Sequence, residues 1–157
     1  MTHPNHGKMA VCGEQRKSPS LPISRSENMR RIRSRDTLPE LMLRRALHKV
    51  GKRYRCNVRA LPGSPDIVFS RHRLAIFVHG CFWHQHPGCT EASQPKTNRP
   101  YWQPKLLGNV ERDRRHRQEL ERLGYKVLVL WECEIERAVS DITLGVIKIL
   151  GEGAPND

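Results

Sequence analysis

The sequence predicts an α/β sandwich in which helices flank a central mixed β-sheet, and three observations lead to this fold class. The chain has 157 residues, which suits one compact domain. Residues 74–79 and 125–131 are almost entirely apolar, as expected of central strands with both faces covered. Segments with helical periodicity stand before, between and after these strands. The predicted order is helix, three strands, helix, strand and helix, which is typical of a layered α/β domain.

The first predicted helix begins after Thr37 and continues to Gly51. Thr37 can cap its N-terminus, Pro39 is tolerated in the first turn, and Glu40 would complete a capping box. One apolar face follows at helical spacing, formed by Leu43, Ala46, Leu47 and Val50. Glu40 therefore stands at the end of this apolar face.

Three short strands follow the first helix, and two more helices with one strand between them complete the domain. The turn Leu-Pro-Gly-Ser-Pro separates the first two strands, and Gly124 ends the long charged helix. A polar, turn-rich loop occupies residues 80–100. The predicted ranges are 54–58, 66–70 and 74–79 for the three strands, 102–123 for the long helix, 125–131 for the last strand and 135–150 for the last helix.

The ends of the chain are predicted to lie outside the folded domain. Residues 1–24 are rich in Pro, Gly, Ser, His and Lys without apolar periodicity, which indicates a flexible N-terminal arm. Residues 25–36 are dense in arginine and are either a solvated face or a segment that grips phosphates. We assign residues 25–153 to one domain and 154–157 to a C-terminal tail, and we expect no repeat and no second domain.

The formal net charge of +12 and the pI of about 10.1 point to a polyanionic partner. Like charges repel one another in a compact state, so such an excess serves binding rather than folding. Nucleic acid is the first candidate and an anionic membrane surface the second. No stretch approaches the roughly 18 apolar residues of a membrane span, and residues 1–26 lack the apolar centre of a signal peptide. We expect a soluble, intracellular, cytoplasmic protein without a membrane partner.

The cysteines indicate metal binding or plain burial, because five is an odd number and disulfides are rare inside cells. Residues 79–89 hold a dense group of potential ligands, namely His79, Cys81, His84, His86 and Cys89. Zinc prefers four such ligands in a tetrahedron. Cys81, His86 and Cys89 can supply three of them from one loop. Cys133 is the best fourth donor, because it stands just past the last predicted strand. The alternative is a chance cluster of buried cysteines.

Asp66 is the candidate ligand for a second metal ion. It follows a tight turn at the start of a strand, and a hairpin of this size can place it beside the end of the next strand. An acidic residue there can hold Mg²⁺, which prefers oxygen ligands, and a main-chain carbonyl such as that of Val78 can supply a second oxygen. His84 can act as general base on an attacking water, since histidine titrates nearest neutral pH. The alternative for Asp66 is a turn residue that binds backbone amides.

The helix segment 109–117 carries many charges, and one of them is a candidate for the active site. Asp113 can orient a histidine base, because such a base commonly has a carboxylate partner that fixes its tautomer. The alternative is a solvated helix with ion pairs four residues apart, such as Glu111 with Arg115. The residues alone leave both interpretations open.

Aromatic side chains concentrate around the Cys/His loop. Phe82 and Trp83 lie inside the loop, and Tyr101 and Trp102 open the following helix. Large rings on a basic surface can stack on bases or wedge between base steps. The alternative is that they pack around the metal and close a minor core.

Six separate motifs stand along residues 26–153. They are Ser-Glu-Asn-Met-Arg (26–30), Arg-Asp-Thr-x-x-Glu (35–40), Gly-Ser-Pro-Asp (63–66), Phe-Val-His-Gly-Cys-Phe-Trp-His (77–84), Asn-Val-Glu-Arg-Asp-Arg-Arg (109–115) and Val-Leu-Trp-Glu-Cys (129–133). In kind and in order they resemble the motifs of the very-short-patch repair endonucleases, the Vsr family of T:G mismatch nickases. The resemblance implies a restriction-endonuclease-like fold with a modified form of that fold's metal site.

The resemblance also implies roles for particular residues. The active-site set would be Asp66 as the essential magnesium ligand, Val78 as a second ligand through its carbonyl, His84 as the base, Asp113 as its carboxylate partner, and Glu40 and His79 as further members. The structural zinc ligands would be Cys81, His86, Cys89 and Cys133. The rings that intercalate beside the mismatch would be Phe82, Trp83 and Trp102.

The implied reaction is hydrolysis of one phosphodiester 5′ to the thymine of a T:G mismatch, in repair of deaminated 5-methylcytosine. It would use Mg²⁺ for catalysis and Zn²⁺ for structure, and a monomer would act on double-stranded DNA. A functional link to a cytosine methyltransferase and to downstream repair proteins would follow. Two alternatives stay open: a non-catalytic zinc-containing DNA-binding module, and a restriction-type nuclease that cuts both strands. Pro87-Gly88 makes the loop longer than the family form, and residues 1–24, Cys12 and Cys56 have no assigned role.

Overall fold

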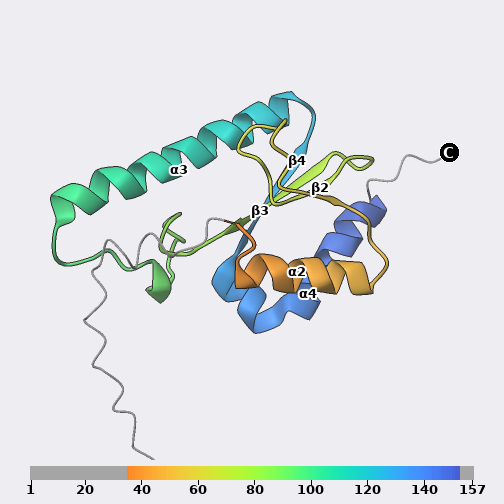
Figure 1. Ribbon diagram of the computed structural model, residues 1–157, viewed down its shortest axis with the longest axis horizontal. Helices are drawn as coiled ribbons and strands as arrows, with labels where there is room; N and C mark the ends of the chain where they lie inside the picture. The colour runs from red at the N-terminus through yellow and green to blue at the C-terminus, as the bar shows by residue number, and fades with distance from the viewer. Residues whose placement is uncertain (1–34, 153–157) are drawn as a thin grey trace, which may run out of the picture. The chain divides into compact units, whose positions relative to one another are not determined.

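The computed structural model describes residues 35–152, and its helices and strands follow the predicted order (Figure 1). The elements are α2 (Leu38–Lys49), β1 (Arg55–Cys56), β2 (Ile67–Phe69), β3 (Leu74–His79), the short 3₁₀ helix η1 (Thr90–Ala92), α3 (Arg99–Arg122), β4 (Lys126–Trp131) and α4 (Glu132–Glu152). The predictions for the arm 1–24, the motif 26–30, most of the arginine-dense segment and the tail 154–157 lie outside the described residues.

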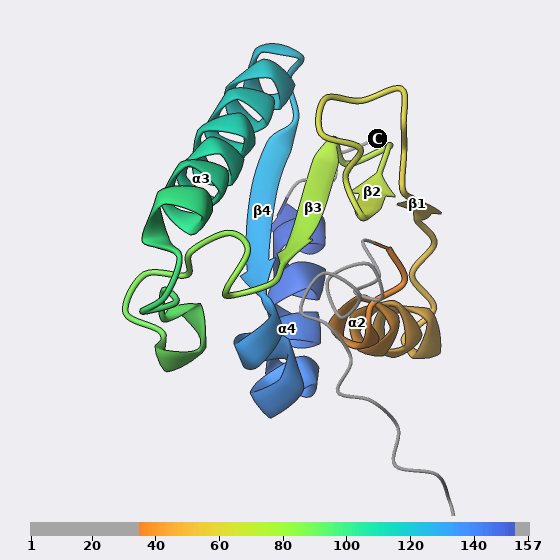
Figure 2. The same ribbon diagram turned by 60° about the vertical axis from the view of Figure 1, so that its left-hand side comes forward.

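The four strands form one mixed sheet in the order β1-β2-β3-β4. The first two pairings are antiparallel and the third, β3 with β4, is parallel. Its register runs from Leu74 opposite Lys126 to His79 opposite Trp131. A parallel pair needs a long crossover, which here contains the Cys/His loop and α3 (Figure 2). Because parallel strands end at the same edge of a sheet, the residues that follow His79 and Trp131 come together there.

Helices α2 and α4 pack together on one side of the sheet, and α3 lies along β4 on the other side (Figures 1 and 2). Side chains alternate along β3, so Leu74 and Ile76 enter the main core whereas Phe77 and His79 line the space beside α3. The buried members of the main core are Leu43, Leu47, Ile67, Phe69, Leu74, Ile76, Leu130, Ile135, Val146 and Leu150. This core fixes the sheet edge from which the Cys/His loop projects. None of the helices within residues 35–152 is long and apolar enough to cross a membrane.

The central strand β3 has the predicted bounds, but several other boundaries differ. β1 is shorter than the predicted range 54–58, because the chain turns at Asn57, whose φ is +47°. α3 begins at Arg99, three residues before its predicted start, and it contains Pro104. α4 begins at Glu132, directly after β4, and the non-helical residue Ala138 (φ −146°, ψ 47°) divides it into two parts.

The N-terminus of α2 is closed differently from the predicted capping box. Thr37 is the N-cap residue, but its side chain accepts no hydrogen bond from the first amides of the helix. Instead the Glu40 carboxylate accepts hydrogen bonds from Thr37 Oγ1 and from the Asp36 amide, both at 3.0 Å. Asp36 has a positive φ of 53°. The prediction was therefore wrong about the Thr37 side chain, and the Glu40 carboxylate instead ties Asp36 and Thr37 to the first turn of the helix.

Candidate active site and metal centre

The Cys/His cluster forms where the ends of β3 and β4 meet. Its four members place one ligand atom each within 4.8 Å of the others, and they are Cys81, His86, Cys89 and Cys133. His86 Nδ1 is 3.4 Å from the sulfurs of Cys81 and Cys133, and the sulfurs of Cys89 and Cys133 are 3.9 Å apart. A tetrahedral zinc, with bonds of about 2.3 Å to sulfur and 2.0 Å to nitrogen, separates its ligand atoms by roughly 3.5–3.8 Å. The four predicted ligands have the spacing that such an ion requires.

Neighbouring side chains hold this cluster in place. Glu132 Oε1 accepts a hydrogen bond from the Cys81 amide at 2.6 Å, which ties the start of the loop to the start of α4. The His86 ring stacks on Trp131, with centroids 4.2 Å apart and planes 7° from parallel. Burial raises the pKa of the Cys81 thiol to about 12, so a thiolate at this position needs a cation beside it. The donor set therefore suits a bound metal better than a reactive thiol.

His84 and Asp113 form a hydrogen-bonded pair between the loop and α3. His84 Nδ1 lies 2.5 Å from Asp113 Oδ2, and the two side chains are 27% and 25% exposed. With the Nδ1 proton donated to the carboxylate, Nε2 of the neutral ring is the acceptor. The His79 ring stacks on His84 at 3.9 Å, with planes 11° apart. Burial and the nearby His84 lower the pKa of His79 to about 4, so His79 is neutral at pH 7.

The same three side chains also have the spacing of a metal site. His79, His84 and Asp113 bring one ligand atom each within 4.8 Å of the others. However, Nδ1 and Oδ2 of the His84–Asp113 pair are only 2.5 Å apart, which is the distance of a short hydrogen bond. Two ligand atoms on one cation, each about 2.1 Å from it, lie roughly 3 Å apart or more. The geometry therefore favours a histidine held by a carboxylate.

Asp66 lies just before β2 and beside the end of β3, as the predicted hairpin requires. Its Oδ2 accepts a hydrogen bond from the Val78 amide at 2.8 Å. Asp66 thus binds a backbone amide, as the turn interpretation proposed, but the amide belongs to the next strand and not to its own turn. The pKa of Asp66 is raised to about 6, because burial and the nearby Glu40 raise it by more than the Val78 amide, Arg44 and His84 lower it. A cation bound here would offset the lost hydration of the carboxylate.

The Glu40 carboxylate is joined to Asp66 through Arg44. Arg44 Nη2 donates to Glu40 Oε2 at 3.0 Å and reaches the main-chain oxygen of Asp66 at 3.4 Å. Arg44 Nη1 donates to Asp36 Oδ1 at 2.5 Å. The sequence analysis missed Arg44, Asp36 and the supporting role of Glu132. Glu40 and Arg44 are four residues apart on one helix, and this spacing is the signal that could have predicted the ion pair between them.

Helix α3 has one face exposed to solvent and another that faces His84 in the candidate site. The expected pair of Glu111 with Arg115 does not form, because Glu111 binds Arg114 at 2.8 Å instead. Asp113, on the inward side, meets His84. Both interpretations of segment 109–117 therefore apply, to different sides of one helix.

The three aromatic residues proposed to intercalate form one cluster with Tyr101. Ring centroids of Phe82, Trp83 and Trp102 lie 5.2–6.1 Å apart. Trp102 is 4% exposed, whereas Phe82 and Trp83 are partly buried. Lys105 Nζ lies 5.5–5.8 Å from the rings of Trp83, Tyr101 and Trp102. This arrangement is a minor core against the loop, and intercalation by Trp102 would require it to leave that core.

A cavity of about 490 Å³ between α3 and the sheet opens beside the His84–Asp113 pair. Its lining includes Phe77, Val129 and Trp131. The turn before Asp66 also contacts α3, since a Cβ added at Gly63 would lie 2.7 Å from His116 Nδ1. α3 therefore borders both the histidine pair and the turn that presents Asp66.

Comparison with known proteins matches this site to one family. The family model described as DNA mismatch endonuclease Vsr matches residues 21–90. The DNA mismatch endonuclease Vsr of Escherichia coli K12 is 45% identical over 136 residues, which cover 83% of this chain and 86% of that protein. The chain belongs to the Vsr family. The type II nicking enzyme V.XorIIP of Xanthomonas oryzae is another Vsr-like relative, 46% identical over 73% of this chain and 83% of its own. V.NaeI of Lentzea aerocolonigenes is 46% identical over 73% of this chain and 70% of its own length.

The Vsr relative from Escherichia coli aligns with more of the chain than the family model does, over 136 residues against residues 21–90. Cys133 and Asp113 lie outside residues 21–90, yet they complete the Cys/His cluster and the histidine pair formed from that segment. Vsr relatives carry the names of DNA endonucleases, and such enzymes use divalent metal ions. This chain is therefore a DNA endonuclease of the Vsr family, with a mixed α/β fold around a four-stranded sheet.

Proposed function

We propose that this Vsr family member hydrolyses one phosphodiester of duplex DNA, 5′ to the thymine of a T:G mismatch, with Mg²⁺ as cofactor. The observation that carries the proposal is the His84–Asp113 pair at 2.5 Å, on the same sheet edge as Asp66. A relative named as a mismatch endonuclease and relatives named as nicking enzymes support a cut in one strand. The net charge of +12 supports binding to the DNA backbone.

The residues of the site divide the work of hydrolysis. His84 Nε2 takes a proton from a water molecule, whose oxygen attacks phosphorus while the bond to the leaving sugar oxygen breaks. Asp113 fixes the tautomer of His84 and stabilises the imidazolium that forms. His79, neutral and stacked on His84, adds no charge that would oppose proton uptake. Asp66 and the Val78 carbonyl would hold Mg²⁺, and Glu40 lies within electrostatic range of Asp66. The bound ion would supply charge stabilisation at the scissile phosphate.

Zinc is the proposed occupant of the Cys/His cluster, with a structural role. Three sulfurs and one imidazole nitrogen would fill the four positions of a tetrahedral zinc ion and would leave none for water or substrate. The cluster joins the loop of residues 81–89 to α4 through Cys133. His84 lies within that loop, so the zinc would fix the base relative to the sheet.

The aromatic cluster is the proposed mismatch reader. Phe82, Trp83 and Trp102 would wedge between base steps, where a mispair lowers the cost of distortion. The partial exposure of Phe82 and Trp83 suits first contact with the duplex. Trp102 would follow only when its buried contacts are exchanged for contacts with bases.

The wider setting follows from the same proposal. The fold would be restriction-endonuclease-like, and a monomer would suffice for a single nick. Repair of deaminated 5-methylcytosine would link the enzyme to a cytosine methyltransferase and to proteins that act after the nick. Residues 25–153 would form the endonuclease domain.

A nicking assay tests the proposal. Two labelled duplexes of one sequence, with a single T:G or T:A pair and with several flanking contexts, are treated with and without added Mg²⁺. The expected result is a nick in the T strand of the mismatched duplex alone, which requires Mg²⁺ and is lost in Asp66→Ala and His84→Ala. Exposed residues of the same types provide matched controls, Asp141→Ala and His48→Ala.

The same assay separates the alternatives. Tight binding without cleavage in every context would indicate a non-catalytic zinc-containing DNA-binding module. Cleavage of both strands in matched duplexes would indicate a restriction-type nuclease.

A further inference from the structure

Arg44 is a buried arginine that binds three parts of the chain near the candidate magnesium site. Its side chain is 11% exposed and that of its partner Glu40 is 4% exposed. The guanidinium contacts Glu40 Oε2, Asp36 Oδ1 and the main-chain oxygen of Asp66. One side chain therefore joins the first turn of α2 to the residue that precedes β2.

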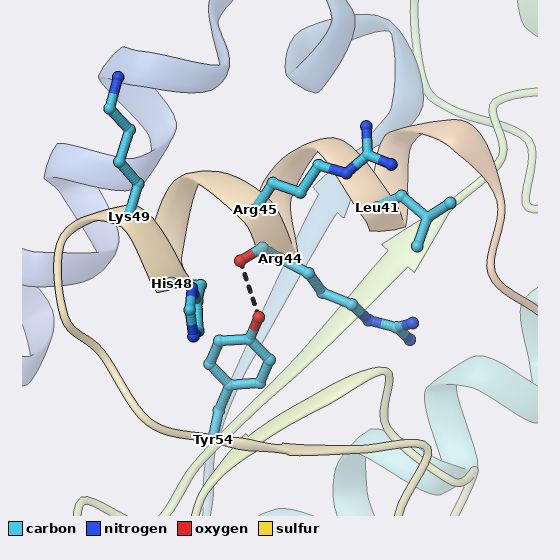
Figure 3. A pocket seen from close by; sticks show the side chains of 6 residues that line it. All are labelled: Leu41, Arg44, Arg45, His48, Lys49 and Tyr54. Carbon is cyan, nitrogen blue, oxygen red and sulfur yellow. Dashed lines mark hydrogen bonds between the residues drawn. The ribbon is translucent and has the colours of Figure 1, made fainter.

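The orientation of Arg44 differs from that of the other basic residues on α2. Figure 3 shows Arg45 and Lys49 extending to one side of the helix and the Arg44 guanidinium to another. Tyr54 donates a hydrogen bond to the Arg44 carbonyl at 2.7 Å, which fixes the helix at this residue (Figure 3). These side chains line a pocket on α2 together with Leu41, His48 and Tyr54, and its basic side chains point in different directions (Figure 3). Arg44 alone is turned towards Glu40 and Asp66.

Stability is a weak reason for an arginine in this place. Burying an ion pair costs desolvation energy that its attraction often fails to recover, and apolar side chains of similar size commonly replace such pairs without loss. Among the described side chains, Arg44 also has a buried Nε without a hydrogen-bond partner. A guanidinium is planar and has several N–H donors in fixed directions. It can therefore hold several acceptors in a defined arrangement, which an apolar side chain cannot do.

We propose that Arg44 is a positioning residue of this site, which sets the Glu40 carboxylate relative to Asp66. The inference rests on the proposed function. Without Arg44, Glu40 keeps its bonds to Thr37 and the Asp36 amide but loses its link to the Asp66 segment. A lysine would keep the charge and lose this planar arrangement of donors.

Single-turnover nicking of the T:G duplex tests Arg44 against its exposed neighbour Arg45. We expect Arg44→Met to lower the cleavage rate at least about tenfold while DNA affinity changes less than about twofold, and Arg44→Lys to restore part of the rate. Arg45→Met should cleave at the wild-type rate. A purely structural role predicts a lower melting temperature with an unchanged rate for the folded protein, and that result would overturn the inference.

A double-mutant cycle with Glu40→Gln tests the route of the effect. If Arg44 acts through Glu40, Arg44→Met should lower the rate less than about threefold when Glu40→Gln is already present. Independent, multiplying losses would refute the proposal. The double variant also removes the buried negative charge that Arg44→Met leaves without its cationic partner, so it provides a folded comparison if that charge prevents the single variant from folding.

An activity-independent measurement separates this inference from the proposed function. The Val78 amide donates to Asp66, so its proton resonance reports on the position of that carboxylate. We expect a shift of this resonance in Arg44→Met and none in Arg45→Met. A wild-type protein that nicks no mismatch would refute the proposed function, whereas an unmoved Val78 resonance would refute the role of Arg44 whatever the activity.

Discussion

Replacing Asp66 by asparagine should stabilise the protein while abolishing cleavage. Burial raises the pKa of Asp66 from an ordinary 3.8 to about 6, so the folded state disfavours the charged carboxylate. One pH unit of displacement corresponds to about 1.4 kcal/mol, which gives an upper limit of about 3 kcal/mol at pH 8. The carboxylate is partly exposed, which is why this value is an upper limit. Asparagine keeps an oxygen that can accept the bond from the Val78 amide.

The pH dependence of this difference has a definite sign. A raised pKa means that the folded protein holds the proton more tightly, so the wild type loses stability as the pH rises from about 4 through about 6. The advantage of Asp66→Asn should therefore be largest at pH 8 and fall to about half at pH 5. Adding Mg²⁺ at pH 8 should stabilise the wild type and leave the variant unchanged, because a ligand stabilises the state that binds it.

Urea denaturation at pH 5, 6.5 and 8, without Mg²⁺ and with zinc retained, measures these differences. Asp141→Asn, on the exposed side of α4, is the matched control and should have wild-type stability at each pH. Equal stability of Asp66→Asn and wild type at pH 8, or an advantage that grows as the pH falls, would refute the electrostatic reasoning.

Three further changes test the site and the turn beside it. Asp113→Asn offers His84 an amide in place of a carboxylate, so the cleavage rate should fall by on the order of 10³–10⁴ with unchanged DNA affinity by fluorescence anisotropy; a wild-type rate would remove Asp113 from the mechanism. Cys133→Ser should lose bound zinc, measured by mass spectrometry of the metal, and several kcal/mol of stability; full zinc content would contradict the ligand set. Gly63→Ala should cost about 2–3 kcal/mol in denaturation, because φ is +73° and the new Cβ would approach His116. Gly51→Ala, at φ +75° with open space around it, should cost only about 1 kcal/mol; equal losses would argue against the His116 contact.

The fold was predictable from the sequence wherever burial leaves a local pattern. β3 occupies the predicted residues 74–79, because every position of a covered central strand is apolar or nearly so. The ends of other elements depend on partners that are distant in sequence. α4 begins earlier than predicted at Glu132, whose carboxylate binds the Cys81 amide across the sheet edge. Periodicity cannot report such a contact.

The candidate site was predictable where its side chains belong to rare types. Cysteines and histidines are few, so their clustering in residues 79–89 was visible, and the parallel register of β3 and β4 explains how Cys133 reaches them. Pairing His84 with Asp113 depended on the family resemblance. The sequence analysis did not single out Arg44, because a spacing of four residues from an acidic side chain says nothing of burial, and burial is what sets Arg44 apart from the other lysines and arginines of residues 35–152.

The long connection between β3 and β4 determines which parts of the fold can form first during synthesis. The β2–β3 hairpin is local and can form as soon as it leaves the ribosome, whereas β4 must close a connection that spans residues 80–125. Asp113 is part of this connection and Cys133 follows it, so a nascent chain carries Asp66 and His84 long before His84 can contact Asp113 or the Cys/His cluster is complete. The candidate site is therefore completed only when residues 80–125 have been synthesised and β3 has paired with β4, and a chain that ends before Asp113 lacks a member of both clusters.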